Sequence, residues 1–124
     1  MSALTAIHRD DAPAYHLPGR DWLLLLGPEN SASRNLTIGV AIFPAGSAPA
    51  PHVHPAQEEI VYIVSGRGRL VTPEGTAALA PGTAVFIPVG LEHGTVNDGD
   101  EPLELVSVFS PPVVPGSYEP STGG

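Results

Sequence analysis

Short apolar runs recur along the chain, and glycine and proline interrupt them at close intervals. The clearest run spans residues 59–64, is rich in β-branched side chains, and ends at Ser65-Gly66, which is typical of a β-strand. Residues 67–72 are expected to follow it as a hairpin partner. Residues 36–43 alternate, so four aliphatic side chains share one face of a strand: Leu36, Ile38, Val40 and Ile42.

Further strands are expected at residues 22–26, 76–79, 84–87, 92–96 and 103–109. About nine short strands separated by turns, with no convincing helix, are typical of an all-β sandwich or barrel. The 124 residues fit one domain that can bury its own core. We divide the chain into an N-terminal arm (1–20), a barrel (21–110) and a proline-rich C-terminal tail (111–124).

Composition narrows the function classes. The chain has no cysteine, which excludes disulfides, thiolate metal ligands and cysteine nucleophiles. A net charge of −8, with five arginines and no lysine, disfavours nucleic acid and anionic membranes as partners. The first residues show no basic segment leading into an apolar run, and the longest apolar run, Trp22 to Leu26, is too short to cross a bilayer. We therefore expect a cytoplasmic protein.

Candidate chemistry gathers around two histidines one residue apart. In an extended segment, His52 and His54 point to the same side, because side chains alternate along a strand. A carboxylate follows shortly, and His93 lies far along the chain. Imidazoles together with a carboxylate are ligands for Fe, Mn, Ni, Co, Zn or Cu as divalent ions, and the residues alone do not choose among these metals.

Two spaced motifs carry a family resemblance. The first reads Gly46-(five residues)-His52-Val53-His54-(four residues)-Glu59-(six residues)-Gly66, and the second reads Gly82-(five residues)-Pro88-Val89-Gly90-(two residues)-His93-(three residues)-Asn97. They resemble the two motifs of the cupin superfamily, with fifteen residues between them. The resemblance implies a double-stranded β-helix, or jelly-roll, barrel that is usually a homodimer. It also implies one divalent transition metal held by His52, His54, Glu59 and His93.

The carboxylate ligand has a competitor in the neighbouring residue. If Glu58 faced the interior, then Ile60, Tyr62 and Val64 would face it too. If Glu59 does, its companions are Val61 and Ile63, and the spacing to Gly66 favours this choice. Asn97 is interpreted as a turn residue whose side chain bonds to backbone, and His8 and His16 as ordinary surface or core residues.

Three functions are considered for the site. The first is a metal-dependent enzyme acting on a small, rather apolar or aromatic substrate; the resemblance implies quercetinase-like dioxygenase chemistry first, then isomerase, decarboxylase, lyase or aminohydrolase chemistry. Glu59 is the candidate catalytic base. The second is a module that binds a metal or small ligand without turnover, and the third a structural barrel with an empty site. Four further polar residues are candidates for the cavity wall: Gln57, Tyr62, Thr95 and Ser107.

Overall fold

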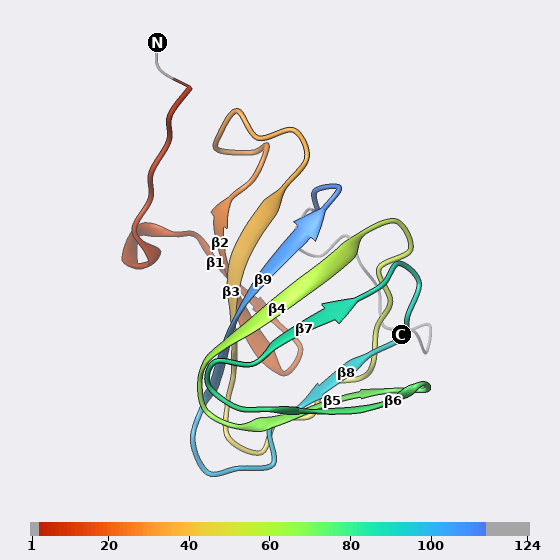
Figure 1. Ribbon diagram of the computed structural model, residues 1–124. Coiled ribbons are helices and arrows are strands. Elements are labelled where there is room, and N and C mark those ends of the chain that lie inside the picture. The colour runs from red at the N-terminus through yellow and green to blue at the C-terminus, as the bar shows by residue number, and fades with distance from the viewer. Residues whose placement is uncertain (1–2, 114–124) are drawn as a thin grey trace.

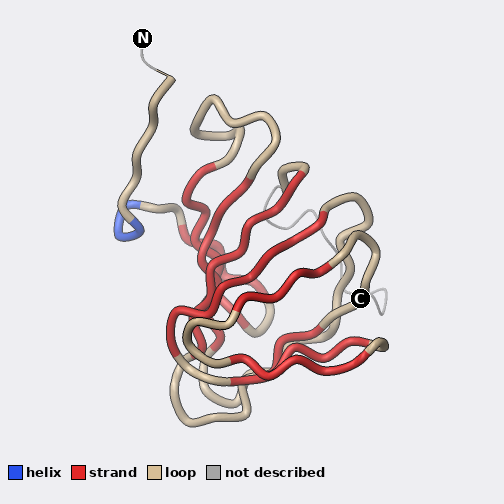
Figure 2. Tube along the Cα trace, viewed as in Figure 1, coloured by secondary structure: helices blue, strands red, loops and turns tan. Residues whose placement is uncertain are grey.

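The computed structural model describes residues 3–113, which form two antiparallel sheets facing each other (Figure 1). The larger sheet has the strand order β1-β2-β3-β9-β4-β7, and the smaller has the order β6-β5-β8. The strands are β1 (Ala14–Leu17), β2 (Arg20–Leu26), β3 (Thr37–Phe43), β4 (Glu58–Ser65), β5 (Gly68–Thr72), β6 (Gly75–Leu79), β7 (Ala84–Ile87), β8 (Gly94–Val96) and β9 (Leu103–Ser110). The expected all-β jelly-roll barrel is confirmed. Figure 2 shows that one short helical turn interrupts the described strands and loops.

The core lies between the two sheets, and strict alternation along β4 shows how it forms. Glu59, Val61 and Ile63 are buried, whereas the residues between them are exposed. The same alternation along β9 buries Leu103, Leu105 and other odd-numbered positions. Each such strand therefore turns one face to the core and the other away from it, which is what a period of two requires.

The hairpin expected between residues 59–64 and 67–72 is wrong. Strand β4 pairs with β7 and β9, whereas β5 pairs with β6 and β8 in the other sheet. Gly66 lies at the crossing with a φ of 82°, and a Cβ there would overlap the carbonyl oxygen of Pro102. This glycine lets the chain pass closely over the β9 entry and change sheets instead of folding back.

Strand β3 turns its smaller and aromatic residues, rather than its aliphatic series, toward the cavity. Ala41 and Phe43 belong to the buried core, whereas Ile38 and Ile42 on the other face are only partly buried. Leu36 precedes the strand and is 53% exposed. The shared face of the aliphatic residues is therefore the face directed away from the site, and Leu36 is not part of it.

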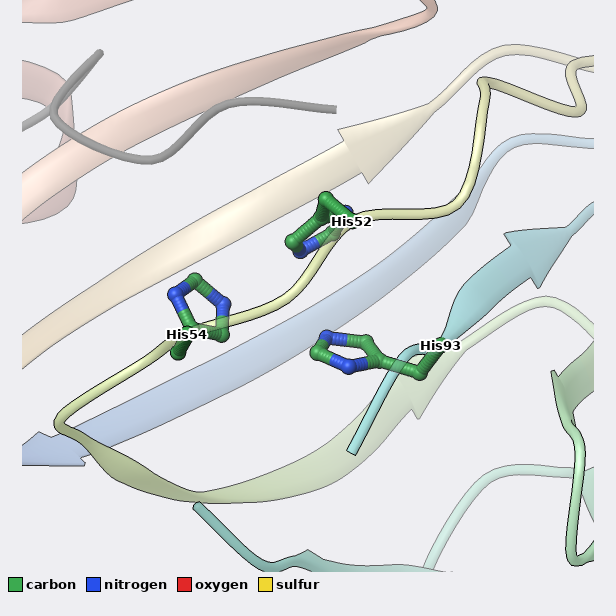
Figure 3. A group of neighbouring side chains, drawn as sticks. All are labelled: His52, His54 and His93. Carbon is green, nitrogen blue, oxygen red and sulfur yellow. The ribbon is translucent and has the colours of Figure 1, made fainter. Parts of the chain in front are cut away.

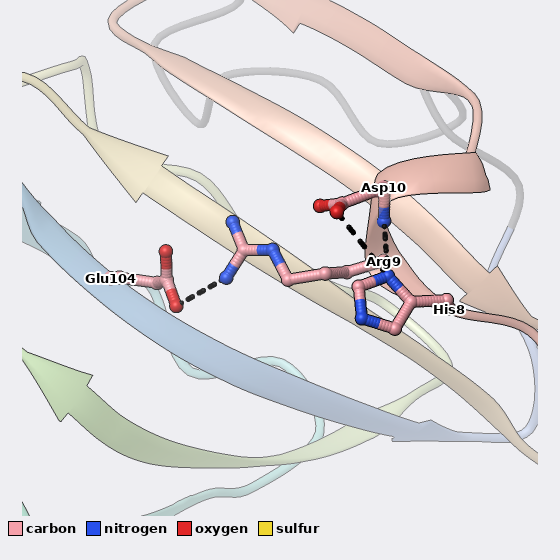
Figure 4. A network of polar contacts seen from close by, with 4 residues as sticks. All are labelled: His8, Arg9, Asp10 and Glu104. Carbon is pink, nitrogen blue, oxygen red and sulfur yellow. Dashed lines mark hydrogen bonds and ion pairs between the residues drawn. The ribbon is translucent and has the colours of Figure 1, made fainter.

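Before β2, the chain forms a 3₁₀ turn, η1 (Arg9–Asp11), and then strand β1, which pairs with β2. His8 caps the turn, since its Nδ1 accepts a hydrogen bond from the Asp10 N–H at 3.1 Å. Arg9 reaches the outer face of β9, where its Nη1 donates to Oε2 of Glu104 at 2.6 Å (Figure 4). These contacts attach the N-terminal segment to the larger sheet.

Most of the expected C-terminal tail, from residue 114 on, lies outside the described residues. Within residues 3–113, no helix is long and apolar enough to cross a membrane.

Candidate metal centre

Three histidines from two distant segments meet inside the barrel, as Figure 3 shows. His52 and His93 form an isolated antiparallel bridge, in which each backbone N–H donates to the carbonyl of the other at 2.9 Å. His52 and His54 lie in an extended connection before β4 rather than in a strand of either sheet. The bridge does what a regular strand would do, because it fixes the His52–His54 segment against the residues that lead into β8.

The donor atoms of these histidines are close enough to share a cation. One ring nitrogen from each of His52, His54 and His93 lies within 4.8 Å of the other two. Metal–nitrogen distances of about 2.1 Å place neighbouring donors about 3 Å apart and opposite donors about 4 Å apart. A closure of up to about 2 Å between neighbouring donors therefore brings three imidazoles to one ion.

Glu59 completes the group, and Glu58 does not. Oε1 of Glu59 lies 3.4 Å from Nε2 of His54 and 3.4 Å from Nε2 of His93. The Glu59 side chain is buried, and its Oε1 has no hydrogen-bond partner. Glu58 is exposed on the opposite face of β4. A buried carboxylate oxygen without a hydrogen bond is costly unless a cation compensates it, so the site fits a metal ion.

The orientation of His93 is set by a backbone contact. Its Nδ1 lies 2.9 Å from the carbonyl oxygen of Leu91. Because a carbonyl can only accept, Nδ1 carries a proton and donates it, so Nε2, which lies 3.4 Å from Oε1 of Glu59, is the nitrogen that remains to bind a metal. A fixed tautomer of this kind is what a metal-binding imidazole needs.

Electrostatics favour a neutral His52 and an ionised Glu59, whereas the pKa of His93 is shifted toward the charged form. Burial, together with the neighbouring His93 and His54, lowers the pKa of His52 to about 3. Burial raises the pKa of Glu59, but the contacts with His54 and His93 outweigh it and hold the value at about 2. Burial lowers the pKa of His93, and the contact with Glu59 more than reverses this, so the net shift is upward. In the absence of a metal, His93 is thus the imidazole that shares its charge with Glu59.

The site opens into a small, mostly apolar cavity of about 40 Å³. Thr95 and Ser107 line it, as expected for two of the four polar candidates. Tyr62 does not, because it faces outward from β4 and is 50% exposed. Gln57 is not part of the lining either; its Nε2 donates to the carbonyl of Pro112 at 3.2 Å.

Two residues of β2 line the cavity without having been expected there. Arg20 was assigned to the arm, and Trp22 only to a buried strand, yet both line the cavity that the histidines line. Trp22 packs edge-on against Phe109, with ring centroids 5.9 Å apart. Their common parity on β2 was the signal available in the sequence: residues 20 and 22 share a face.

Asn97 lies outside the cavity and organises the loops behind it. Its Nδ2 donates to three carbonyls, those of Phe43, Pro44 and Glu101, at 2.8–3.1 Å. Its Oδ1 accepts from the N–H of Gly99 at 3.1 Å. The expected turn role is confirmed, and it extends to joining the end of β3 to the β8–β9 connection.

Comparison with known proteins agrees with the fold and the site. The profile of the cupin domain matches residues 39–109, which is more than half of the chain. This protein therefore belongs to the cupin family.

Relatives of the chain occur in Streptomyces and in archaea. The "Polyketide synthase CurC" of Streptomyces cyaneus is 33% identical over 93 residues, covering 75% of this chain and 60% of that protein. The "Protein SchB" of Streptomyces halstedii is 30% identical over 102 residues, covering 82% of this chain and 74% of that protein.

Among solved structures, the polyketide cyclase RemF from Streptomyces resistomycificus has a TM-score of 0.78 and 22% identity, covering 95% of this chain and 85% of RemF. At this identity the similarity shows the fold alone. Other cupins that resemble the chain in sequence or fold are named as an isomerase, a lyase and a predicted oxalate decarboxylase. The family thus combines one fold with several reactions.

Proposed function

We propose that the protein is a mononuclear metal-dependent enzyme that closes rings in a small polyketone substrate. The observation that supports it is the group of His52, His54 and His93, with the buried Oε1 of Glu59 beside them making no hydrogen bond. These four side chains would hold one divalent transition metal. Such a metal supplies Lewis-acid polarisation of a substrate carbonyl, which makes the neighbouring carbon more acidic.

The walls of the cavity suit such a substrate. Trp22, Phe43 and Phe109 give it an aromatic lining, while Thr95 and Ser107 add hydroxyl groups. Because the cavity volume is only about 40 Å³, a ligand enters with one edge rather than as a whole. The aromatic side chains would press a planar polyketone edge against the site and keep water away from it.

Glu59 serves better as a ligand than as a proton acceptor. A general base works best with a pKa near the working pH, whereas the pKa of Glu59 is held at about 2. It is ionised at every pH at which the fold is expected to be stable, as a metal-binding carboxylate must be. The catalytic role of Glu59 in this proposal is therefore to hold the metal, and a base role is secondary.

The choice of ring closure rests on the relatives, since a polyketide synthase and a polyketide cyclase are named among them. Dioxygenase chemistry on an aromatic substrate is the second candidate. It is supported by the same donor set, because three imidazoles and one carboxylate would hold a divalent ion and leave open positions for small ligands.

The test separates these reactions from simple binding. Protein purified without chelators or metal resin is loaded with each candidate metal and incubated with poly-β-ketone thioester analogues and flavonols, with and without oxygen. Ring closure that does not require oxygen supports the proposal. Oxygen uptake matched to product formation supports the dioxygenase, and a metal-loaded protein inert to both panels indicates a binding module. The His93→Ala variant is the inactive control.

A further inference from the structure

Two side chains of β2 give the cavity a polar corner that the metal-binding residues do not explain. Arg20 and Trp22 both line the cavity, although neither lies in the two histidine-bearing segments. Arg20 is the first residue of β2 and follows the tight β1–β2 connection. The two residues face the same side of the strand because they are two positions apart.

Trp22 contributes a hydrogen-bond donor that the protein does not use. The side chain is 3% exposed, and its Nε1 has no hydrogen-bond partner. An indole N–H can only donate, and burying a donor without an acceptor costs about 1–3 kcal/mol. An oxygen atom of a ligand in the cavity would supply the missing acceptor.

Arg20 contributes charge. Of the described residues that line the cavity, it is the only one with a permanent positive charge. Its Nη1 donates to the carbonyl of Pro18 at 3.0 Å, which holds the side chain against the turn. A guanidinium has five N–H donors, so this contact is compatible with binding a further acceptor.

The charge balance of the cavity favours an anionic ligand. A divalent ion (+2), an ionised Glu59 (−1) and Arg20 (+1) would together give the cavity a net charge of +2, which a ligand bound there would partly neutralise. With a single guanidinium, the cavity matches one carboxylate rather than a polyanion. The apolar remainder of the wall disfavours further charge.

We propose that Arg20 and the Trp22 indole N–H form a subsite that selects a substrate bearing one carboxylate next to its keto oxygens. Arg20 binds the carboxylate, and Trp22 donates to an oxygen of the ligand. This inference rests on the proposed function, because the metal supplies the other half of the binding site. It makes Arg20 and Trp22 specificity-determining residues, distinct from the four that hold the metal.

The test uses a matched pair of probes, acetoacetate and its uncharged amide acetoacetamide, bound to the cobalt(II)-loaded protein. Dissociation constants are read from the visible absorption of cobalt, with cobalt content measured for each variant. Arg20→Gln should weaken acetoacetate about tenfold or more and change acetoacetamide less than about twofold, since a hydrogen bond to a charged group contributes about 1.5–3 kcal/mol. Arg20→Lys should retain most of the preference. Trp22→Phe should weaken both probes about fivefold.

Arg34→Gln is the control, because this substitution removes the same charge from the chain at an exposed position in the β2–β3 connection. The proposal is overturned if Arg20→Gln weakens the binding of both probes equally, or weakens acetoacetate binding no more than Arg34→Gln does. It is also overturned if the Arg20→Gln protein loses its cobalt, or if the wild-type protein does not bind acetoacetate more tightly than acetoacetamide. Failure of the proposed function has a different signature: the wild-type protein binds acetoacetate with the expected preference but converts no polyketone.

Discussion

A substitution at Gly39 should displace the indole of Trp22 while every metal-binding residue stays unchanged. A Cβ at Gly39 would overlap Cη2 and Cζ2 of Trp22 and would lie 2.7 Å from the carbonyl oxygen of Leu23. The latter contact is with backbone of the paired strand β2, which cannot retreat without breaking the β2–β3 ladder. We expect Gly39→Ala to lower the free energy of unfolding by about 2–3 kcal/mol, as overpacking of a core does.

The assay is urea denaturation followed by tryptophan fluorescence. Trp22 is the only tryptophan in the chain, so the emission reports on the cavity wall itself. The native emission of Gly39→Ala should also shift, because the ring must move. The control is Gly94→Ala, where the added Cβ would lie 3.4 Å from the nearest atom of Pro51, an ordinary contact. Its stability should change by less than about 1 kcal/mol. Equal stability of the two variants, with unchanged emission, would refute the packing argument.

Three further outcomes are expected. Asn97→Ala should lower the free energy of unfolding by about 2–4 kcal/mol, because three backbone carbonyls lose their donor; calorimetry showing a loss below about 1 kcal/mol would contradict this. In metal-free protein, the pKa of His52 is about 3 when folded and 6.5 when unfolded, so the unfolded chain takes up the proton first. Stability should therefore fall as the pH drops from 6.5 to 5, and His52→Gln should reduce that slope in urea titrations. We also expect a homodimer, since β4 and β7 expose an apolar patch: Ile60, Tyr62, Val64 and Phe86. Light scattering should show a dimer that Phe86→Glu dissociates, and a wild-type monomer would count against it.

Much of the fold could be predicted because the strands are short and strongly patterned. Residues 84–87 coincide with β7, and the boundaries of most other expected strands differ by one or two residues. Pairing was harder. Nothing local distinguishes a hairpin at Ser65-Gly66 from a crossing between sheets, because both require a glycine with positive φ. The difference lies in the contact with Pro102, which is distant in sequence.

The site shows the same division. The position of Glu59 inside the barrel follows from the alternation along β4, which also turns Tyr62 outward. Parity alone would have excluded Tyr62 from the cavity once Glu59 was chosen. Parity places Arg20 on the same face of β2 as Trp22, but it does not predict that this face lines the cavity beside the histidines. A motif identifies residues by spacing, and residues that enter a cavity from another strand have no fixed spacing to it.

The central claim is that His52, His54, Glu59 and His93 hold one metal ion. The most direct measurement is elemental analysis of protein purified without chelators or metal resin, beside His52→Ala, Glu59→Gln and a control. His16→Ala is a suitable control, since His16 is exposed and its Nδ1 contacts Oδ1 of Asp21 at 2.7 Å instead of a residue of the metal site. The account predicts about one equivalent of a divalent transition metal in the wild-type protein and in His16→Ala, and a large loss in both site variants. Equal metal content in all four proteins, or none in any of them after supplementation, would contradict it.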